Sequence, residues 1–198
     1  SGVVANTQGS PALAFDGANY LVVWQDLASG NNDITGRRVS PAGTLLGAAN
    51  VPISTAANGQ TAPAVAYDGT NYLVIWQDNR VAGRLDIFGT QYDKTDVVNP
   101  LAGVQISSAA TTWAGPPALS FDGTNFLVVW ADWRAGAPNI YGRQVNTAAP
   151  PLPLGAADIA ISTAANTQTV PTAAFDGTYH FVIWQDRRSG TNEDLYWA

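Results

Sequence analysis

The sequence predicts an all-β protein, a four-bladed β-propeller built from four repeats of about 50 residues with four antiparallel strands in each blade. The first observation is the repeat itself: a 16-residue apolar segment recurs four times, and its tryptophan recurs at spacings of 52, 54 and 54 residues. The second is composition. The 198 residues include only one Glu, one Lys and no Met, and these three residue types favour helices. They include 19 Gly, which favours turns, and 20 aromatic residues, which favour strands.

Each repeat contains four strand-like segments, which the first repeat illustrates. The first segment leads from Pro11 into an Asp-Gly turn at Asp16, and Asp-Gly between apolar runs is a strong signal of a β-hairpin. The second, residues 20–24, is apolar almost without interruption, so both of its faces should be buried between stacked blades. The third begins at Asp33, and the fourth ends at an Ile-Ser pair, residues 53–54. The turn-forming aspartates are Asp16, Asp68, Asp122 and Asp176.

The repeats are expected to form a single domain over residues 1–198. Their approximate bounds are residues 6–57, 58–111, 112–165 and 166–198. The last repeat is one strand short, and we expect the Val3-Val4 pair at the N-terminus to complete the last blade and to close a four-bladed ring. The alternatives are a longer array of blades and an open blade edge that pairs with another chain. Such pairing gives a homo-oligomer, for example one eight-bladed ring from two chains.

Charge and composition exclude several partners and cofactors. The net charge of −6 argues against nucleic-acid binding, which requires clusters of Lys and Arg, and no apolar run is long enough for membrane insertion. Without cysteine there is no disulfide, thiol catalysis or cysteine-ligated zinc. The single histidine, His180, stands at an aromatic position of the repeat and is interpreted as a packing residue. No cofactor is expected, with an ion in the central channel as an open alternative.

Each second strand ends in an aspartate two residues after the repeated tryptophan. In three repeats an arginine follows two residues later, whereas Ala28 stands there in the first. Asp-Arg pairs satisfy backbone donors in tight turns, and four equivalent carboxylates are unlike a catalytic pair, whose members need different environments. We therefore predict a structural role for the repeated pairs Trp24 and Asp26, Trp76 and Asp78, Trp130 and Asp132, and Trp184 and Asp186.

Two further tryptophans, Trp113 and Trp133, depart from the repeat. Both are predicted to lie in loops that emerge on the same face of the third blade, with Arg134 and Asp132 beside them. An aromatic wall with adjacent polar groups suits stacking on a sugar or on a proline-rich peptide. These four residues are therefore the candidate ligand-binding site, and the alternative is that the two tryptophans cap the apolar end of one blade.

The blade motif also resembles a known group of proteins. The run Trp184-Gln-Asp-Arg-Arg-Ser-Gly, followed by Asp194-Leu-Tyr, resembles the blade motif of TolB-type and related bacterial propeller repeats. Four repeats in a chain of this length are similar in size to hemopexin-type four-bladed propellers. The resemblance covers all four repeats and implies the propeller fold. It also implies a bacterial protein that is secreted or on the cell surface.

Together these features predict a lectin-like, non-enzymatic recognition module of an extracellular or cell-surface protein, which binds a glycan or a protein through one face of the propeller. The alternative is a structural repeat module that assembles through its open edge strand. A glycoside hydrolase is the third reading, because propellers can place carboxylates at the mouth of the channel. The near-identity of the repeats and the single Glu193 argue against that third reading.

Overall fold

The computed structural model describes residues 7–108 and 113–198, and within these ranges it contains fifteen β-strands and no helix. The strands form four antiparallel sheets, one for each repeat, so the predicted all-β, four-bladed propeller arrangement is confirmed. No helix in the described ranges is therefore available to cross a membrane.

The strands follow one another across each sheet in chain order. Blade 1 contains β1 (Gln8–Phe15), β2 (Tyr20–Asp26), β3 (Asp33–Val39) and β4 (Val51–Ser54). Blade 2 contains β5 (Gln60–Tyr67), β6 (Tyr72–Asp78), β7 (Asp86–Tyr92) and β8 (Val98–Gln105). Blade 3 contains β9 (Ala118–Phe121), β10 (Asn125–Ala135), β11 (Ala137–Asn146) and β12 (Ile159–Ser162). Blade 4 contains β13 (Gln168–Phe175), β14 (His180–Asp186) and β15 (Asp194–Trp197).

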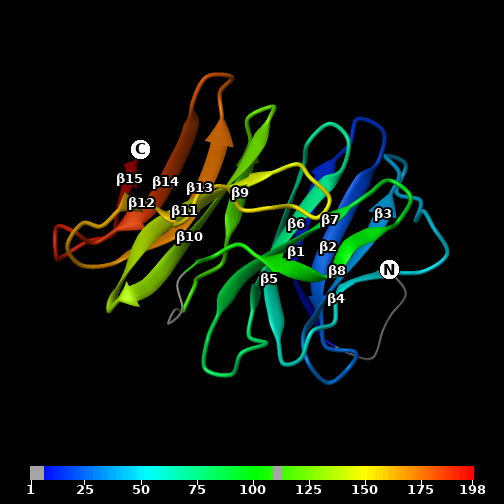
Figure 1. Cartoon of the computed structure of the whole chain (residues 1–198), viewed down its shortest axis with the longest axis horizontal. Helices are drawn as coiled ribbons and strands as arrows, with labels where there is room; N and C mark the ends of the chain where they lie inside the picture. The colour runs from blue at the N-terminus through cyan, green and yellow to red at the C-terminus, as the bar shows by residue number, and fades with distance from the viewer. Residues whose placement is uncertain (1–6, 109–112) are drawn as a thin grey trace.

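The first strands of the blades are the inner strands of the propeller. They contact one another in the order β1, β5, β9 and β13, and they lie toward the middle of the molecule in Figure 1. The outer strand β3 of blade 1 and the last strand β15 lie at opposite sides of that view. Blade 4 has three strands among the described residues. The fourth strand expected from Val3-Val4 lies outside them and stays a prediction.

The Asp-Gly turns join the first and second strands as their sequence indicates. In blade 1, Oδ1 of Asp16 accepts hydrogen bonds from the backbone N–H groups of Ala18 at 2.8 Å and Asn19 at 2.6 Å. Gly17 has φ +91°, a conformation that a residue with a side chain rarely adopts. The other three turns repeat this pair of bonds at Asp68, Asp122 and Asp176.

A glycine in the third strand lets the fourth strand pack closely. A Cβ atom built on Gly89 would lie 2.7 Å from Cδ1 of Ile106, which is closer than real side chains approach. The isoleucine therefore fills the space that a side chain on the third strand would need. The equivalent pairs in blades 1 and 3 are Gly36 with Ile53 and Gly142 with Ile161.

Three apolar clusters hold the blades together, one at each junction between neighbours. Between blades 1 and 2, Leu21 and Val23 of β2 share a cluster with Val74 and Trp76 of β6, and all four are fully buried. Burying each such side chain stabilises the fold by about 1.5–3 kcal/mol. The propeller is therefore held chiefly by packing between the faces of successive sheets.

The expectation that every second strand is buried on both faces holds only for the interior blades. All seven residues of β6 are buried, but along β2 the side chains on one face, including Trp24, are half-buried. Trp24 is therefore only half-buried, although the sequence predicts a second strand that is buried on both faces. The physical reason is that a sheet face is buried only where a neighbouring blade packs on it, and no described blade precedes blade 1.

One ion pair joins blades 1 and 2 on the side of the Asp-Gly turns. Nε of Arg38, from β3, donates to Oδ1 of Asp96 at 2.6 Å, and the Tyr92 hydroxyl donates to the same oxygen at 2.7 Å. The hydrogen bond from Arg38 holds the pKa of Asp96 below its ordinary value. Both side chains are largely shielded from solvent, so the pair contributes to the junction.

We predict that Arg38→Gln lowers the free energy of unfolding by about 1 kcal/mol at pH 7, as expected for a partly exposed ion pair. Because the pKa of Asp96 is lower in the folded state, the contribution is present above the unfolded-state value near 3.8 and is lost as the pH falls through the folded-state pKa. Urea unfolding at pH 7 and pH 2 should show a difference between the two proteins only at pH 7. Arg37→Gln, which removes a bond to a loop carbonyl, is the control; an equal loss at both pH values would contradict the assignment.

Candidate functional site

The same hydrogen-bonded unit ends each second strand in blades 2, 3 and 4. In blade 2, Nε1 of Trp76 donates to Oδ2 of Asp78 at 2.8 Å, and the backbone N–H of Arg80 donates to Oδ1 at 2.8 Å. The Arg80 guanidinium donates to both carboxylate oxygens and lies 3.7 Å from the centre of the Phe88 ring. One carboxylate thereby joins the second strand, the following turn and the third strand.

Blades 3 and 4 repeat this unit with different aromatic partners. The equivalent residues are Asp132, Arg134 and Tyr141 in blade 3, and Asp186, Arg188 and Tyr196 in blade 4. Burial by itself would raise the pKa of Asp186, but hydrogen bonds from Arg188 and Trp184 outweigh it and lower the pKa. These carboxylate side chains are fully buried, and an arginine neutralises each of them, so the unit is a structural one.

Blade 1 lacks the cationic part of this unit. Oδ2 of Asp26 accepts hydrogen bonds from Nε1 of Trp24 at 3.2 Å and from Nε2 of Gln8 at 2.9 Å. Oδ1 accepts one from the backbone N–H of Ala28 at 2.9 Å, and the residue is 8% exposed. Ala28 stands at the arginine position, and Thr35, the cross-strand neighbour of Trp24, stands at the aromatic position. The two shortened side chains leave space beside Asp26 that the other blades fill.

Asp26 also has a second carboxylate beside it. Its cross-strand neighbour on β3 is Asp33, whose side chain points to the same face of the sheet and is half-buried. Neither carboxylate forms an ion pair within residues 7–108 and 113–198. Opposite partners in an antiparallel pair have Cβ atoms about 4.5–5.5 Å apart, so this is a close pair of acids with no balancing cation.

Blade 3 extends its unit into a buried ionic network. Nη2 of Arg134 donates at 2.7 Å both to Asp132 and to Asp158, which lies on the loop between β11 and β12. Arg143 donates to the other oxygen of Asp158 at 3.2 Å. Burial alone would lower the pKa of Arg134, but its hydrogen bonds to the two aspartates outweigh burial and raise the pKa. The network anchors the end of β10 that carries Trp133.

The two candidate tryptophans lie side by side on one end of the sheets. We call this end the upper face; it carries the connections between second and third strands, which are residues 27–32, 79–85, 136 and 187–193. The backbone N–H of Trp133 donates to the carbonyl of Trp113 at 3.3 Å, and the side chains are 36% and 56% exposed. Trp113 also bridges to Leu85 of blade 2. The pair thus forms an aromatic platform across the junction of blades 2 and 3.

The structure changes two details of the predicted site. Trp133 lies in the strand β10, which continues to Ala135 beyond a bulge, and not in a loop. Asp132 and Arg134 are adjacent in the chain to Trp133, but their side chains turn into the buried network. The predicted group of four therefore divides into an exposed aromatic pair and a buried ionic pair. The burial of Asp132 was already indicated by its place in the repeat.

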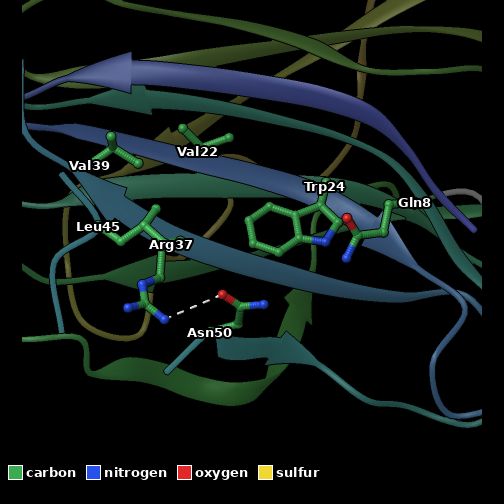
Figure 2. A pocket seen from close by; sticks show the side chains of 7 residues that line it. All are labelled: Gln8, Val22, Trp24, Arg37, Val39, Leu45 and Asn50. Carbon is green, nitrogen blue, oxygen red and sulfur yellow. Dashed lines mark hydrogen bonds between the residues drawn. The ribbon is translucent and has the colours of Figure 1, made fainter. Parts of the chain in front are cut away.

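An open groove covers the face of blade 1 that no described blade contacts. It has a volume of about 340 Å³ and contains the ring of Trp24, with Gln8 at one end and Arg37 and Asn50 at the other (Figure 2). Val22, Val39 and Leu45 complete its lining. The equivalents of Trp24 are buried at blade junctions, with Trp76 and Trp130 fully inaccessible to solvent. The groove is therefore the exposed half of a blade junction.

The remaining titratable groups do not assemble a metal site in the described part of the chain. No group of three or more His, Asp or Glu side chains there is arranged to hold a metal ion, so an ion in the channel stays a prediction. His180 packs against the Phe175 ring, and its Nδ1 shares a hydrogen bond of 2.8 Å with the Ser120 hydroxyl of blade 3. His180 therefore packs at the junction of blades 3 and 4, in line with its interpretation as a packing residue.

Comparison with known proteins supports the fold. No protein-family model and no curated protein matches the sequence. Among solved structures, the chain is similar to an α-L-arabinanase from Penicillium chrysogenum complexed with arabinobiose, with 14% identity, a TM-score of 0.57, and coverage of 91% of this chain and 56% of that one. An α-L-arabinofuranosidase from Clostridium thermocellum gives 13% identity, a TM-score of 0.57, and coverage of 95% and 67%. A thermostable family-43 glycoside hydrolase gives 14% identity, a TM-score of 0.53, and coverage of 88% of this chain and 64% of that one.

These structures correct two expectations. The propeller is confirmed, but the similar structures are glycoside hydrolases and not TolB-type or hemopexin-type propellers. The prediction of a non-enzymatic recognition module is contradicted by the same finding, as is the prediction that the chain is not an enzyme. At these identities the likeness itself establishes the fold. The chain spans less than two thirds of the length of the family-43 hydrolase and of the arabinanase.

We predict that Arg134→Met destabilises the protein by about 3 kcal/mol, because it leaves the buried carboxylates of Asp132 and Asp158 without their shared cation. Arg188→Met, the matched change in blade 4, removes a cation that serves one carboxylate and is itself one-third exposed. Its loss should be smaller. Urea denaturation followed by tryptophan fluorescence measures the free energy of unfolding of both variants. Equal losses of unfolding free energy would show that the cation shared by two carboxylates stabilises the fold no more than a cation that serves one.

Proposed function

We propose that this propeller hydrolyses a glycan and binds it across the upper face. The observation that carries the proposal is the exposed aromatic platform of Trp113 and Trp133, which lies on a fold shared with glycoside hydrolases. One of those structures is an arabinanase complexed with arabinobiose, and another is an arabinofuranosidase in complex with cellotriose. A polysaccharide containing arabinose is therefore the proposed substrate class.

The platform suits a sugar for physical reasons. An indole side chain has only two rotatable bonds, and the backbone bond keeps the two residues adjacent, so little conformational entropy is lost when a ligand stacks on them. The apolar face of a pyranose or furanose ring can cover an indole while its hydroxyl groups stay in water. Because the platform crosses the junction of blades 2 and 3, it offers more than one adjacent stacking position to a polymer.

Glycosidic hydrolysis also requires two carboxyl groups. We assign this role to Asp26 and Asp33, the cross-strand pair that no cation neutralises in the described structure. One carboxyl group protonates the leaving oxygen as the bond from the anomeric carbon breaks, and the other draws a proton from the attacking water or itself attacks that carbon. The sum of the steps consumes one water and restores both groups. The upper face carries both this pair and the platform, so a polymer that crosses several blades can reach both.

The first test of this proposal concerns binding. We expect reducing sugar to be released from arabinan, and Trp113→Ala and Trp133→Ala each to raise KM roughly tenfold with little change in kcat, because stacking contributes equally to substrate and transition state. The control is Tyr179→Ala, which removes an aromatic side chain of similar exposure at the opposite end of the sheets. Activity that is insensitive to both tryptophans would exclude the platform from substrate binding.

The second test concerns the carboxylates. Asp33→Asn should reduce kcat roughly a hundredfold or more with the fold intact, as expected on loss of a general acid or base. Asp194→Asn is the matched control, because Asp194 occupies the same register in blade 4 beside an aspartate that Arg188 neutralises. The anomeric configuration of the first product, followed by NMR, distinguishes direct attack by a carboxylate from attack by water. Equal rates for the two variants would reject Asp33 as a catalytic residue.

A further inference from the structure

Two sheet faces at the ends of the blade series have no neighbour in the described structure. We call the side of a blade that meets the next blade in the chain its forward face, and the opposite side its backward face. The backward face of blade 1 exposes Leu13 by 62%, and the forward face of blade 4 exposes Leu195 by 67% and Trp197 by 65%. Apolar side chains exposed in this number on two flat faces are typical of an interface.

The two open faces are the two halves of the junction that the chain already builds three times. At each internal junction the forward face of one second strand packs against the backward face of the next, as Leu21 and Val23 do against Val74 and Trp76. By register, Phe181 and Ile183 of blade 4 are the forward-face equivalents of that first pair. Val22 and Trp24 of blade 1 are the backward-face equivalents of the second pair.

The side chains at the two ends also differ from the internal ones in a compensating way. On the forward face, Trp197 takes the position of the glycines in the third strands of blades 1, 2 and 3, so blade 4 presents a large knob where the others present a small residue. On the backward face, Thr35 and Ala28 take the positions of an aromatic ring and an arginine, which opens the groove beside Trp24 (Figure 2). The larger side chain at Trp197 therefore has a complementary space in the groove that the smaller side chains of Thr35 and Ala28 leave open.

Polar groups at the two ends fit the same junction. Between blades 1 and 2, Oε1 of Gln25 accepts a hydrogen bond from the backbone N–H of Ala62 at 3.2 Å. Gln185 is the equivalent of Gln25 in blade 4, and Ser10 is the equivalent of Ala62 in blade 1. Ser10 and Ala62 share an unusual backbone, with φ values of +48° and +49°.

A second backbone contact recurs at the internal junctions. The N–H of Gln60 donates to the carbonyl of Asn32 at 2.7 Å, and the N–H of Ala114 donates to that of Leu85 at 2.9 Å. The equivalent groups at the open ends are the N–H of Gln8 in blade 1 and the carbonyl of Glu193 in blade 4. Both ends therefore present the hydrogen-bonding groups that a further junction would use.

We propose that two copies of this chain associate head to tail, the forward face of blade 4 in each copy packing on the backward face of blade 1 in the other. Trp197 of one copy fills the groove beside Trp24 of its partner. Two such junctions, related by twofold symmetry, cover all four open faces and close a ring of eight blades. The partner is a second copy because the complementary half of each open face is present on this chain itself.

The mass in solution provides the first test. Light scattering at micromolar concentration should give twice the 20.7 kDa of the chain. Trp197→Ala should shift the protein to the single-chain mass, whereas Trp113→Ala, which truncates an exposed tryptophan on the upper face, should leave the pair intact. A single-chain mass for the unmodified protein at every concentration would overturn the proposal.

A cysteine cross-link provides the second test. Because the chain contains no native cysteine, any disulfide that forms must involve the introduced thiols. In the double variant Ser10→Cys and Gln185→Cys, oxidation should yield a covalent pair of chains on a non-reducing gel. The control variant, Ser10→Cys with Thr178→Cys, places the second thiol at the opposite end of the sheets and should stay uncoupled. A single chain that loses both free thiols would show closure within one copy and would also overturn the proposal. Neither readout depends on hydrolytic activity.

Discussion

The hydrogen bond from a tryptophan indole to the aspartate two residues later is the interaction on which each blade depends. It occurs in all four blades, with Nε1–Oδ2 distances from 2.8 to 3.2 Å. The bond fixes the large ring on the backward face of the sheet, where the preceding blade packs on it in blades 2, 3 and 4. It also places the carboxylate where it can cap the following turn. Core packing between blades and the geometry of the upper face therefore have a common origin.

The distinctive features of the protein arise where this unit is altered. In blade 3 the arginine is shared with Asp158, and the resulting network supports the end of β10, where Trp133 is exposed. In blade 1 the arginine and the stacked aromatic are replaced by Ala28 and Thr35, so Asp26 keeps its indole partner and pairs with no cation in residues 7–108 and 113–198. One alteration provides the proposed sugar platform. The other provides both the proposed catalytic pair and the open groove.

Much of the blade was predictable because its contacts are local. The turn at Asp16 closes through bonds to the next three residues, and the Asp-Arg pairs span two residues, so short motifs suffice to predict them. The surroundings of Trp24 and Trp133 could not be predicted from the repeat, because other elements determine them. No described blade packs on the face that carries Trp24, and Trp133 lies in a strand lengthened by pairing with β11. The near-identity of the repeats argued against an enzyme, and the similarity to glycoside hydrolase structures contradicts that argument.

The four-blade repeat, the all-β class and the residues that build each turn can be predicted from the amino-acid sequence, since they follow from periodicity and from bonds between near neighbours. Which sheet faces are covered, and which carboxylates are neutralised, depends on how the blades pack. Asp26 and Asp132 each follow the repeated tryptophan by two residues and both are buried, but Arg134 neutralises Asp132, whereas no cation among the described residues pairs with Asp26. Burial and charge compensation are properties of the packed assembly of blades, because they depend on residues far away in the chain.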